Sequence, residues 1–204
     1  MQPVRAVTGT AAPLDRSDVD TDQIIPSDWL KRVERTGFGK GLFAEWRDDR
    51  NFVLNDPERA AATILVAGPN FGTGSSREHA VWALMDYGFK AVVSPRFGDI
   101  FRNNCTKAGL VPVQVDAADG AALLAAVTEN PALEVTVDVE KLLVSAPEAG
   151  IEAAFALDSY TQHRLLEGLD DIGLTMRHSD DVGSYERRRP AWMPSVPVRD
   201  AAGE

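Results

Sequence analysis

The sequence predicts an α/β domain with a partly parallel sheet flanked by helices. Three short runs of apolar, largely β-branched residues, at 62–68, 90–95 and 110–115, alternate with two stretches of helical character, 77–88 and 97–109. Short connections between strand, helix, strand, helix and strand are typical of parallel strands with helices packed across them. The length of 204 residues and a hydrophobic content of 44% fit a single domain that buries a full core.

Each element is predicted from its local pattern. Strand 62–68 reads ATILVAG, and the glycine turn NFGTGSS follows it. Helix 77–88 is predicted to end at Gly88, because glycine readily adopts the left-handed backbone conformation that commonly ends a helix. Its apolar residues fall at helical spacing: Ala80, Ala83, Leu84 and Tyr87. Gly109 ends the second helix in the same way.

The C-terminal half continues with an Ala- and Leu-rich helix within 117–130 and further short strands. The strand candidates are 133–137, 141–145 and 151–155. A last helical region, 159–178, contains Gly168 and Gly173 as expected breaks. We expect one domain over residues 1–190 and a C-terminal tail, 191–204, that is poorly ordered or packs on a partner.

Charge and cysteine content exclude several classes of protein. A net charge of −10 repels phosphate, so nucleic acid and anionic membranes are poor partners. Cys105 is the only cysteine, so the chain forms no internal disulfide and cannot by itself ligate an iron–sulfur cluster. His79, His163 and His178 lack the spacing of a zinc site, and we expect no metal on this chain. No apolar run approaches the roughly 18 residues of a membrane span, and a cytoplasmic location is expected.

A basic, glycine-rich stretch interrupts this acidic chain. Residues 31–40, KRVERTGFGK, carry four cations against the single acid Glu34. The cations are Lys31, Arg32, Arg35 and Lys40. Such a loop is a candidate for capturing an anion or is simply a solvated loop, and charge alone leaves both interpretations open.

The turn NFGTGSSREH, 70–79, is the most informative segment. A glycine turn that leads into a helix directs backbone N–H groups and the positive end of the helix dipole toward one space, which suits an anion. A nucleotide loop is disfavoured, because the turn has no Lys and only two glycines, Gly72 and Gly74. Ser75 and His79 form a possible nucleophile and base, although a third orienting group is missing.

A purely structural interpretation of the same turn is a capping box. Ser75 would cap the helix and Glu78 would bond back to it. This explains both residues without chemistry. It does not explain Arg77, which lies where the helix dipole disfavours a cation, and which therefore suggests that an anion binds there.

The segment NFGTGSSREHAVWALMDYGFKAVVSPRFGDIF, 70–101, closely resembles the small subunits of 3-isopropylmalate dehydratase, in the aconitase superfamily. Four other segments fit the same family: DVDTDQIIP (18–26), RTGFGKGLFAEWR (35–47), FVLN (52–55) and GLDDIGLT (168–175). The resemblance covers the chain from about residue 14 to residue 190.

This resemblance implies a fold and an activity. The fold is the aconitase-type swivel domain, a layered β/β/α structure with mixed parallel and antiparallel strands. The activity is that of a hydro-lyase of leucine biosynthesis, which interconverts 2-isopropylmalate and 3-isopropylmalate by dehydration and rehydration. The resemblance also implies a large-subunit partner that carries a 4Fe-4S cluster, in a heterodimer or a larger assembly. Alternatives are a hydratase for citraconate/2-methylmalate or homoaconitate, or a non-catalytic RNA-binding or regulatory protein.

The resemblance also assigns roles to residues. Ser75 resembles the family's base, acting as an alkoxide, with Arg77 and Asp22 beside it in the catalytic group. The substrate-binding group implied by the family is Thr21, Arg32, Phe38 and Ser76. Lys31 is the alternative to Arg32, and Phe38 is the apolar candidate for contact with the isopropyl group. His79 is expected to be a structural helix residue.

Overall fold

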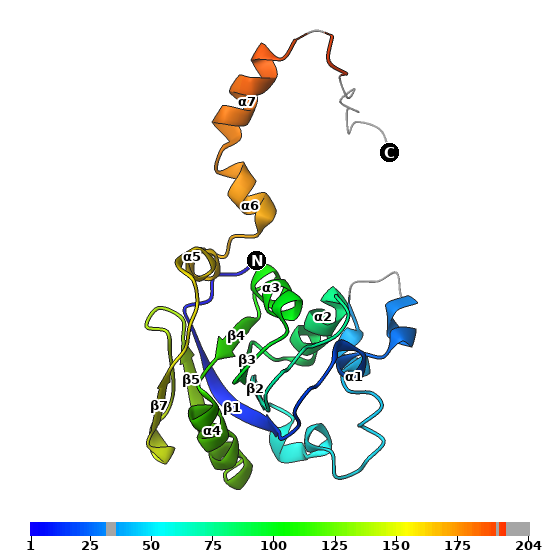
Figure 1. Cartoon of the computed structure of the whole chain (residues 1–204), viewed down its shortest axis with the longest axis vertical. Coiled ribbons are helices and arrows are strands. Elements are labelled where there is room, and N and C mark those ends of the chain that lie inside the picture. Colours follow the sequence, from blue (N-terminus) through cyan, green and yellow to red (C-terminus); the bar gives the residue numbers. More distant parts are fainter. Residues whose placement is uncertain (32–35, 191, 195–204) are drawn as a thin grey trace. The chain divides into compact units, whose positions relative to one another are not determined.

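The structure, a computed structural model, describes residues 1–31, 36–190 and 192–194. Within this part of the chain, seven strands form one sheet in the order β4-β3-β2-β1-β5-β6-β7. Strands β4, β3, β2 and β1 run parallel, and β5, β6 and β7 continue from β1 as antiparallel neighbours (Figure 1). The strand bounds are β1 Ala6–Leu14, β2 Ile64–Ala67, β3 Ala91–Ser94, β4 Val111–Gln114, β5 Glu134–Asp138, β6 Leu143–Ala146 and β7 Ile151–Ala154.

Helices α2 and α3 connect the parallel strands, which confirms the predicted alternation of strands and helices. Each of the six predicted strands lies within two or three residues of an observed one. The helix bounds are α1 Thr21–Ile24, α2 Glu78–Tyr87, α3 Asp99–Ala108, α4 Ala117–Glu129, α5 Ser159–Glu167, α6 Asp171–Met176 and α7 Ser179–Arg188. As predicted, α2 and α3 end at glycines with positive φ, Gly88 at 126° and Gly109 at 96°.

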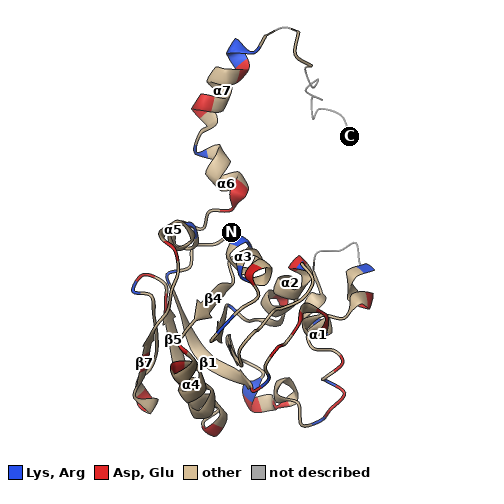
Figure 2. Ribbon diagram, viewed as in Figure 1, with Lys and Arg blue, Asp and Glu red and all other residues tan. Residues whose placement is uncertain are grey.

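The parallel half of the sheet is buried on both faces. Along β2, Leu65 and Ala67 belong to the core that includes α2 and α3, whereas Ile64 and Val66 belong to the core with α4 and the antiparallel strands. Strand β5 alternates between buried and partly exposed residues, as expected of a sheet with one solvated face. This sheet, with helices packed on it, confirms the predicted α/β fold of mixed parallel and antiparallel strands, and the seven strands form one continuous sheet. Strands β1 to β4 carry no charged residue, and the charges lie mainly on helices and loops (Figure 2).

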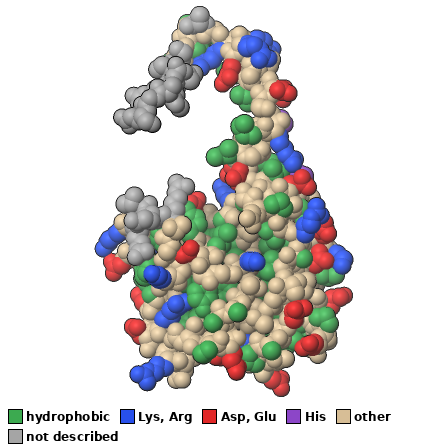
Figure 3. Space-filling model, turned by 180° about the vertical axis from the view of Figure 1, so that it is seen from behind, with side chains coloured by type: hydrophobic (Ala, Val, Ile, Leu, Met, Phe, Trp, Pro, Cys, Tyr) green, Lys and Arg blue, Asp and Glu red, His purple; other side chains and the backbone are tan. Residues whose placement is uncertain are grey.

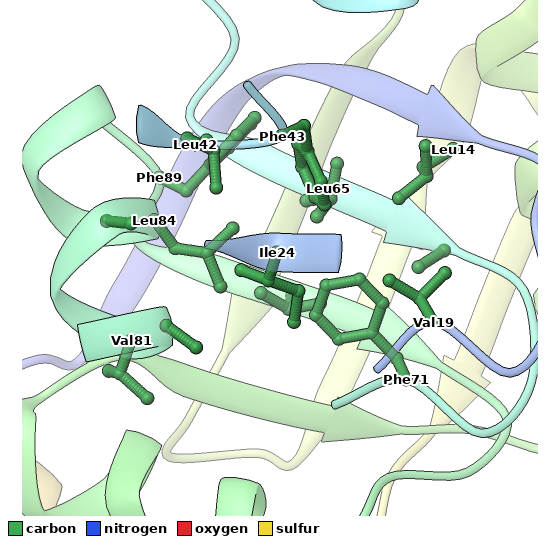
Figure 4. Close-up of a cluster of buried hydrophobic side chains, with 14 of the residues drawn as sticks. Leu14, Val19, Ile24, Leu42, Phe43, Leu65, Phe71, Val81, Leu84 and Phe89 are labelled. Atoms are coloured by element: carbon green, nitrogen blue, oxygen red, sulfur yellow. The ribbon is translucent and has the colours of Figure 1, made fainter. Parts of the chain in front are cut away.

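The segment between β1 and β2 packs α1 against the start of α2. Ile24 of α1 is fully buried and lies among Phe71, Val81 and Leu84 (Figure 4). The N–H of Phe43 donates to the carbonyl of Ile24 at 2.8 Å, which fixes the chain that returns after residues 31–41. This core therefore holds α1 beside the turn that precedes α2.

The chain divides into two compact units, Met1–Asp170 and Asp171–Glu204. The second unit contains α6 and α7, and none of the residues in these two helices is buried. The expected break at Gly168 is confirmed, with φ of 67° after α5, but the break expected at Gly173 is wrong, because Gly173 lies inside α6. Helix α7 is absent from the sequence prediction. The predicted boundary at residue 190 remains a prediction, since most of the tail lies outside the described residues.

Within the described residues, no helix has the length and apolar character needed to span a bilayer.

A buried arginine ties three elements of the first unit together. Arg59, 4% exposed, donates hydrogen bonds to the carbonyl oxygens of Ala11 (3.0 Å), Val127 (2.5 Å) and Thr128 (3.1 Å). Two of these carbonyls lie in the last turn of α4, where a cation also complements the helix dipole. Burial lowers the pKa of the Arg59 guanidinium, and the neighbouring carboxylate of Asp56 opposes that shift. Arg59 therefore fastens α4 to the central strand β1.

Replacing Arg59 by methionine tests this role. Arg59→Met keeps much of the volume but leaves three carbonyl groups without their donor, so we expect a loss of about 1–3 kcal/mol in the free energy of unfolding. Tm should fall by about 2–4 °C for each kcal/mol. Urea and thermal unfolding measure both quantities, with the exposed Arg50→Met as the matched control. Equal midpoints for the two variants would contradict the assignment.

Candidate active site

The turn between β2 and α2 lies at the carboxyl end of the parallel strands, where open α/β sheets commonly bind ligands. Gly72 and Gly74 have φ of 74° and 85°, a backbone that side chains rarely adopt. A Cβ at Gly72 would lie 2.2 Å from the ring of Phe101, so the turn also packs too closely for a side chain there. Both glycines of the predicted anion turn are thus required by its geometry.

Helix α2 begins one residue later than predicted, and its N-cap is Arg77. No side chain caps this end of the helix. The predicted capping box of Ser75 and Glu78 is therefore wrong. The physical reason is a competing tertiary bond: the Ser75 carbonyl accepts a hydrogen bond from Thr21, which holds Ser75 in the turn rather than at the cap.

The backbone N–H groups at this point are unused. From Gly74 to His79, none of these groups donates a hydrogen bond to any part of the chain that the structure describes. Unpaired N–H groups at the start of a helix carry its partial positive charge and bind anions readily. The turn therefore has the geometry of an anion site, as the sequence predicts.

The segment before α1 lies beside this turn. Asp20 and Thr73 form a parallel β-bridge, and the Val19 carbonyl accepts hydrogen bonds from the N–H groups of Gly72 (2.7 Å) and Thr73 (3.2 Å). The Asp20 carboxylate caps α1 by accepting from the N–H of Gln23. Residues that are more than 50 positions apart are thereby brought into one site.

Asp22 and Arg77 form an ion pair across the two segments. The Asp22 side chain is 55% exposed and that of Arg77 is 16% exposed. The buried Nη1 of Arg77 contacts the carboxylate but makes no well-aligned hydrogen bond. Asp22 therefore holds the guanidinium beside the turn without using its full donor capacity.

A hollow of about 560 Å³ opens over the start of α2. It is lined by Leu30, Ser75, Ser76, Arg77, Glu78 and His79. Ser75 and Ser76 are exposed there, as a role in chemistry requires. A second hollow, of about 570 Å³, lies at the other end of α2 around Gly88. Its lining includes Lys90 but no acid, hydroxyl or imidazole side chain, so it lacks the combination of an acid or hydroxyl with a cation that the first hollow has.

Phe38, one of the predicted substrate-binding residues, does not line the hollow. Phe38 is fully buried, with its ring 5.3 Å from that of His79 and 5.8 Å from that of Trp82. It forms part of the core beneath the hollow and offers no surface to a ligand. The ring of His79 packs against both of these rings, 4.7 Å from that of Trp82, and His79 also lines the hollow.

Leu30 is the apolar side chain that does line the hollow, and sequence reasoning missed it. Its position directly before the basic stretch 31–40 could have indicated Leu30 as an apolar contact for a substrate. Phe38, near the end of the same stretch, was an equally good candidate on sequence alone. Thr21 is 2% exposed, and its hydroxyl is already donated to the Ser75 carbonyl. Arg32 lies outside the described residues, and Lys31 is exposed and pairs with Asp28 at 2.9 Å.

The chain offers no ligand set for a metal cluster in its described part. No three His, Cys, Asp or Glu side chains gather there. Cys105 is fully buried in α3, and burial raises the pKa of its thiol well above the ordinary value. A thiol that stays protonated is a poor ligand for iron. A 4Fe-4S cluster therefore does not fit the residues that the structure describes.

Comparison with known proteins identifies the class and then the family. Residues 1–118 match the family model described as the aconitase C-terminal domain. Residues 171–195 match a second model, described as the C-terminal domain of the 3-isopropylmalate dehydratase small subunit. The chain therefore has an α/β domain of the aconitase C-terminal class, followed by an extension described for one family.

Curated relatives over nearly the whole chain carry one name, 3-isopropylmalate dehydratase small subunit. The relative from Frankia casuarinae is 63% identical over 189 residues, which cover 93% of this chain and 96% of the relative. That from Rubrobacter xylanophilus is 58% identical and covers 96% of this chain and 100% of the relative. The chain belongs to the family of 3-isopropylmalate dehydratase small subunits.

A solved structure agrees with this assignment. The crystal structure of 3-isopropylmalate dehydratase (LeuD) from Methanocaldococcus jannaschii superposes with a TM-score of 0.66 at 26% identity, covering 88% of this chain and 99% of that one. The resemblance inferred from the sequence and the predicted fold class are thus confirmed. As a small subunit of a dehydratase, the chain is one part of a hydro-lyase with a larger partner.

The close packing of Gly72 leads to a stability prediction. Gly72→Ala places a Cβ against Phe101 and also strains φ, whereas Gly150→Ala meets the strain alone, because nothing lies within 4 Å of its Cβ. We expect Gly150→Ala to cost about 1–2 kcal/mol. Gly72→Ala should cost roughly 1–3 kcal/mol more. Urea unfolding compares the two, and equal losses would show that the turn is not packed as described.

Proposed function

We propose that this chain supplies the proton-transfer and carboxylate-binding groups of an enzyme that interconverts 2-isopropylmalate and 3-isopropylmalate in leucine biosynthesis. The observation that carries the proposal is the exposed Ser75, set among unused backbone N–H groups and beside the Asp22–Arg77 ion pair. The same turn belongs to the segment matched by the aconitase C-terminal family model. Membership of the dehydratase small-subunit family supports the proposal that this arrangement works in a dehydratase.

The chemical difficulty is the removal of a proton from carbon next to a carboxylate. In our proposal Ser75 takes that proton as an alkoxide, while the hydroxyl on the neighbouring carbon departs as hydroxide, for which the large subunit would supply the Lewis acid, and an unsaturated diacid remains. Hydroxide then adds to the carbon that lost the proton, and the Ser75 proton goes to the carbon that lost the hydroxyl, which completes the isomerisation and restores the alkoxide. A serine alkoxide is a strong base, so it needs donors that favour its charge before the reaction begins. The N–H groups of the turn are such donors.

Arg77 and Ser76 bind the substrate in this scheme. A guanidinium forms two parallel hydrogen bonds with a carboxylate, which fixes the substrate in angle as well as in distance. Asp22 fixes Arg77 in turn, so its role is to orient the cation. Leu30 supplies the apolar wall of the hollow nearest these groups, and we propose that it, rather than Phe38, meets the isopropyl group.

We propose that the iron–sulfur cluster of the enzyme belongs to the large subunit. The support is the lack of a ligand set in the described part of this chain and the buried, protonated Cys105. The hollow over Ser75 lies at the surface of this chain. Closure by the large subunit would exclude water, and the hydrogen bonds from the turn would strengthen accordingly.

The second unit offers a further contact for the large subunit. Short helices are marginal in water unless an apolar face is covered. Helices α6 and α7 bury no residue, yet they expose Ile172 (74%), Met176 (63%) and Tyr185 (58%). Figure 3 shows hydrophobic side chains exposed along this helical segment. The match of residues 171–195 to a model specific for these small subunits supports a partner common to the family.

Removing the Ser75 hydroxyl tests the proposed chemistry. Ser75→Ala should lower turnover by about 10²–10⁴-fold, because general-base catalysis contributes on that order. The measurement is the absorbance of the unsaturated intermediate after co-expression with the large subunit and anaerobic reconstitution, with isopropylmalate and citraconate compared. Ser145→Ala on β6 is the matched control, and gel filtration verifies that assembly is intact. Full turnover in an assembled Ser75→Ala enzyme would reject the role of Ser75.

Polar substitutions in the second unit test the partner contact. Ile172→Glu combined with Met176→Glu should weaken binding of the large subunit by roughly tenfold or more, as expected for central apolar contacts. The Tm of the variant chain alone should stay unchanged, since these side chains are exposed. Calorimetric titration against the purified large subunit gives the affinity. Tyr160→Glu, at an equally exposed site in the first unit, is the control, and equal affinity for both variants would exclude the contact.

A further inference from the structure

Thr21 is a polar residue that the fold buries almost completely. It is 2% exposed and begins α1, directly beside the turn. Both of its hydrogen-bond donors go to that turn. Its N–H donates to the carbonyl of Thr73 at 3.0 Å, and its hydroxyl Oγ1 donates to the carbonyl of Ser75 at 2.8 Å. One residue therefore holds two peptide groups, one on either side of the Gly74–Ser75 peptide.

Because the peptide group is planar, these two hydrogen bonds also determine the direction of two N–H groups. In a trans peptide the N–H points opposite to the C=O of the same group. The Thr73 carbonyl shares its peptide with the N–H of Gly74, and the Ser75 carbonyl shares its peptide with the N–H of Ser76. Because both carbonyls face Thr21, both N–H groups face away from it, and neither is hydrogen-bonded within the described residues.

Thr21 is itself held firmly. The Asp20 and Gln23 side chains form a reciprocal capping box at the start of α1. The Thr21 carbonyl accepts from the N–H of Ile25, which is fully buried. Gly74 has a φ of 85°, a backbone conformation that side chains rarely adopt, and a Cβ there would make only ordinary contact with Asp20, at 3.4 Å. The position of Thr21 is thus fixed by the core and not by the turn that it orients.

We propose that Thr21 is a positioning residue that directs the N–H groups of Gly74 and Ser76 toward the Ser75 oxygen and its substrate. This deepens, and rests on, the proposed role of Ser75. The hydroxyl of Thr21 is a donor already used inside the chain, so Thr21 acts through the turn and does not bind substrate. Without Oγ1, the peptide between Ser75 and Ser76 loses the bond that sets its rotation.

The test compares Thr21→Val, which has nearly the same shape but no hydroxyl, with Thr21→Ser, which keeps the hydroxyl. In the reconstituted two-subunit enzyme with isopropylmalate, Thr21→Val should lower kcat by roughly 10–100-fold, since small misplacements of catalytic groups cost this much. KM should stay within about twofold, because an interaction made mainly in the transition state is lost. Thr21→Ser should recover most of kcat.

A spectroscopic measurement on the full chain alone separates orientation from turnover. In ¹⁵N-labelled protein, Thr21→Val should shift the amide resonances of Gly74 and Ser76 and leave that of Gly150 in place, whereas Thr21→Ser should leave all three near the wild-type positions. Val137→Ala, in the core of β5 and far from the turn, is the control for lost stability. It should change neither these resonances nor kcat below its Tm.

The outcomes are distinguishable. Loss of turnover in Ser75→Ala together with full turnover and unchanged amide resonances in Thr21→Val overturns this inference alone. Full turnover in both variants overturns the role of Ser75 and this inference with it. A Thr21→Ser enzyme as impaired as Thr21→Val would also overturn it, because the hydroxyl would then not be the group that matters.

Discussion

The pairing of residues 19–21 with the turn 72–75 is the contact on which the site depends. Strands β1 and β2 are parallel neighbours, so the chain leaves both at the same edge of the sheet. There the Val19 carbonyl accepts two N–H groups of the turn, and Thr21 donates to two of its carbonyls. The turn's inward-facing polar groups are thereby satisfied, and the remaining N–H groups are left for a ligand. Gly72 and Gly74 supply the backbone conformation that this pairing requires.

Local sequence pattern was sufficient for three of the four parallel strands, β2, β3 and β4, and for the helices between them. Apolar runs such as 62–68 are typical of strands buried on both faces, and Gly88 and Gly109 fix where the helices between them end. The antiparallel half was predicted only as separate strands. The pairing of β5 with β1 joins Val135 to Gly9 and Val137 to Val7, across more than 120 residues, and no local pattern encodes such a pairing. Helix α7 was missed because it has only two large apolar residues, Val182 and Tyr185, which are too few for a helical pattern to stand out in the sequence.

The sequence predicted which polar and charged residues of the candidate site lie together, but it did not predict which apolar residue lines the hollow. Ser75, Arg77 and Asp22 lie together as the motifs imply, because glycine turns and helix starts are local features. The capping box failed because a tertiary bond from Thr21 outweighed a local preference. Leu30 precedes the basic stretch and Phe38 lies within it, so sequence alone does not tell which of these two apolar residues is buried. In the structure Phe38 is buried because it packs against the rings of His79 and Trp82. The motif predicted that Thr21 lies beside the turn, but only the hydrogen bond to the Ser75 carbonyl shows where its hydroxyl points.

The acidity of the chain makes this local arrangement necessary. With a net charge of −10, the mean field of the protein repels a dianionic substrate. Attraction must therefore come from groups close enough to outweigh that field, and in the proposed site these groups are a helix start and one guanidinium. Asp22 lies beside Arg77 and opposes this attraction only weakly. Its carboxylate is 55% exposed and so is screened by water, whereas Arg77 is 16% exposed and is screened less. If the large partner covers the hollow and excludes this water, the attraction between the turn and an anion would become stronger.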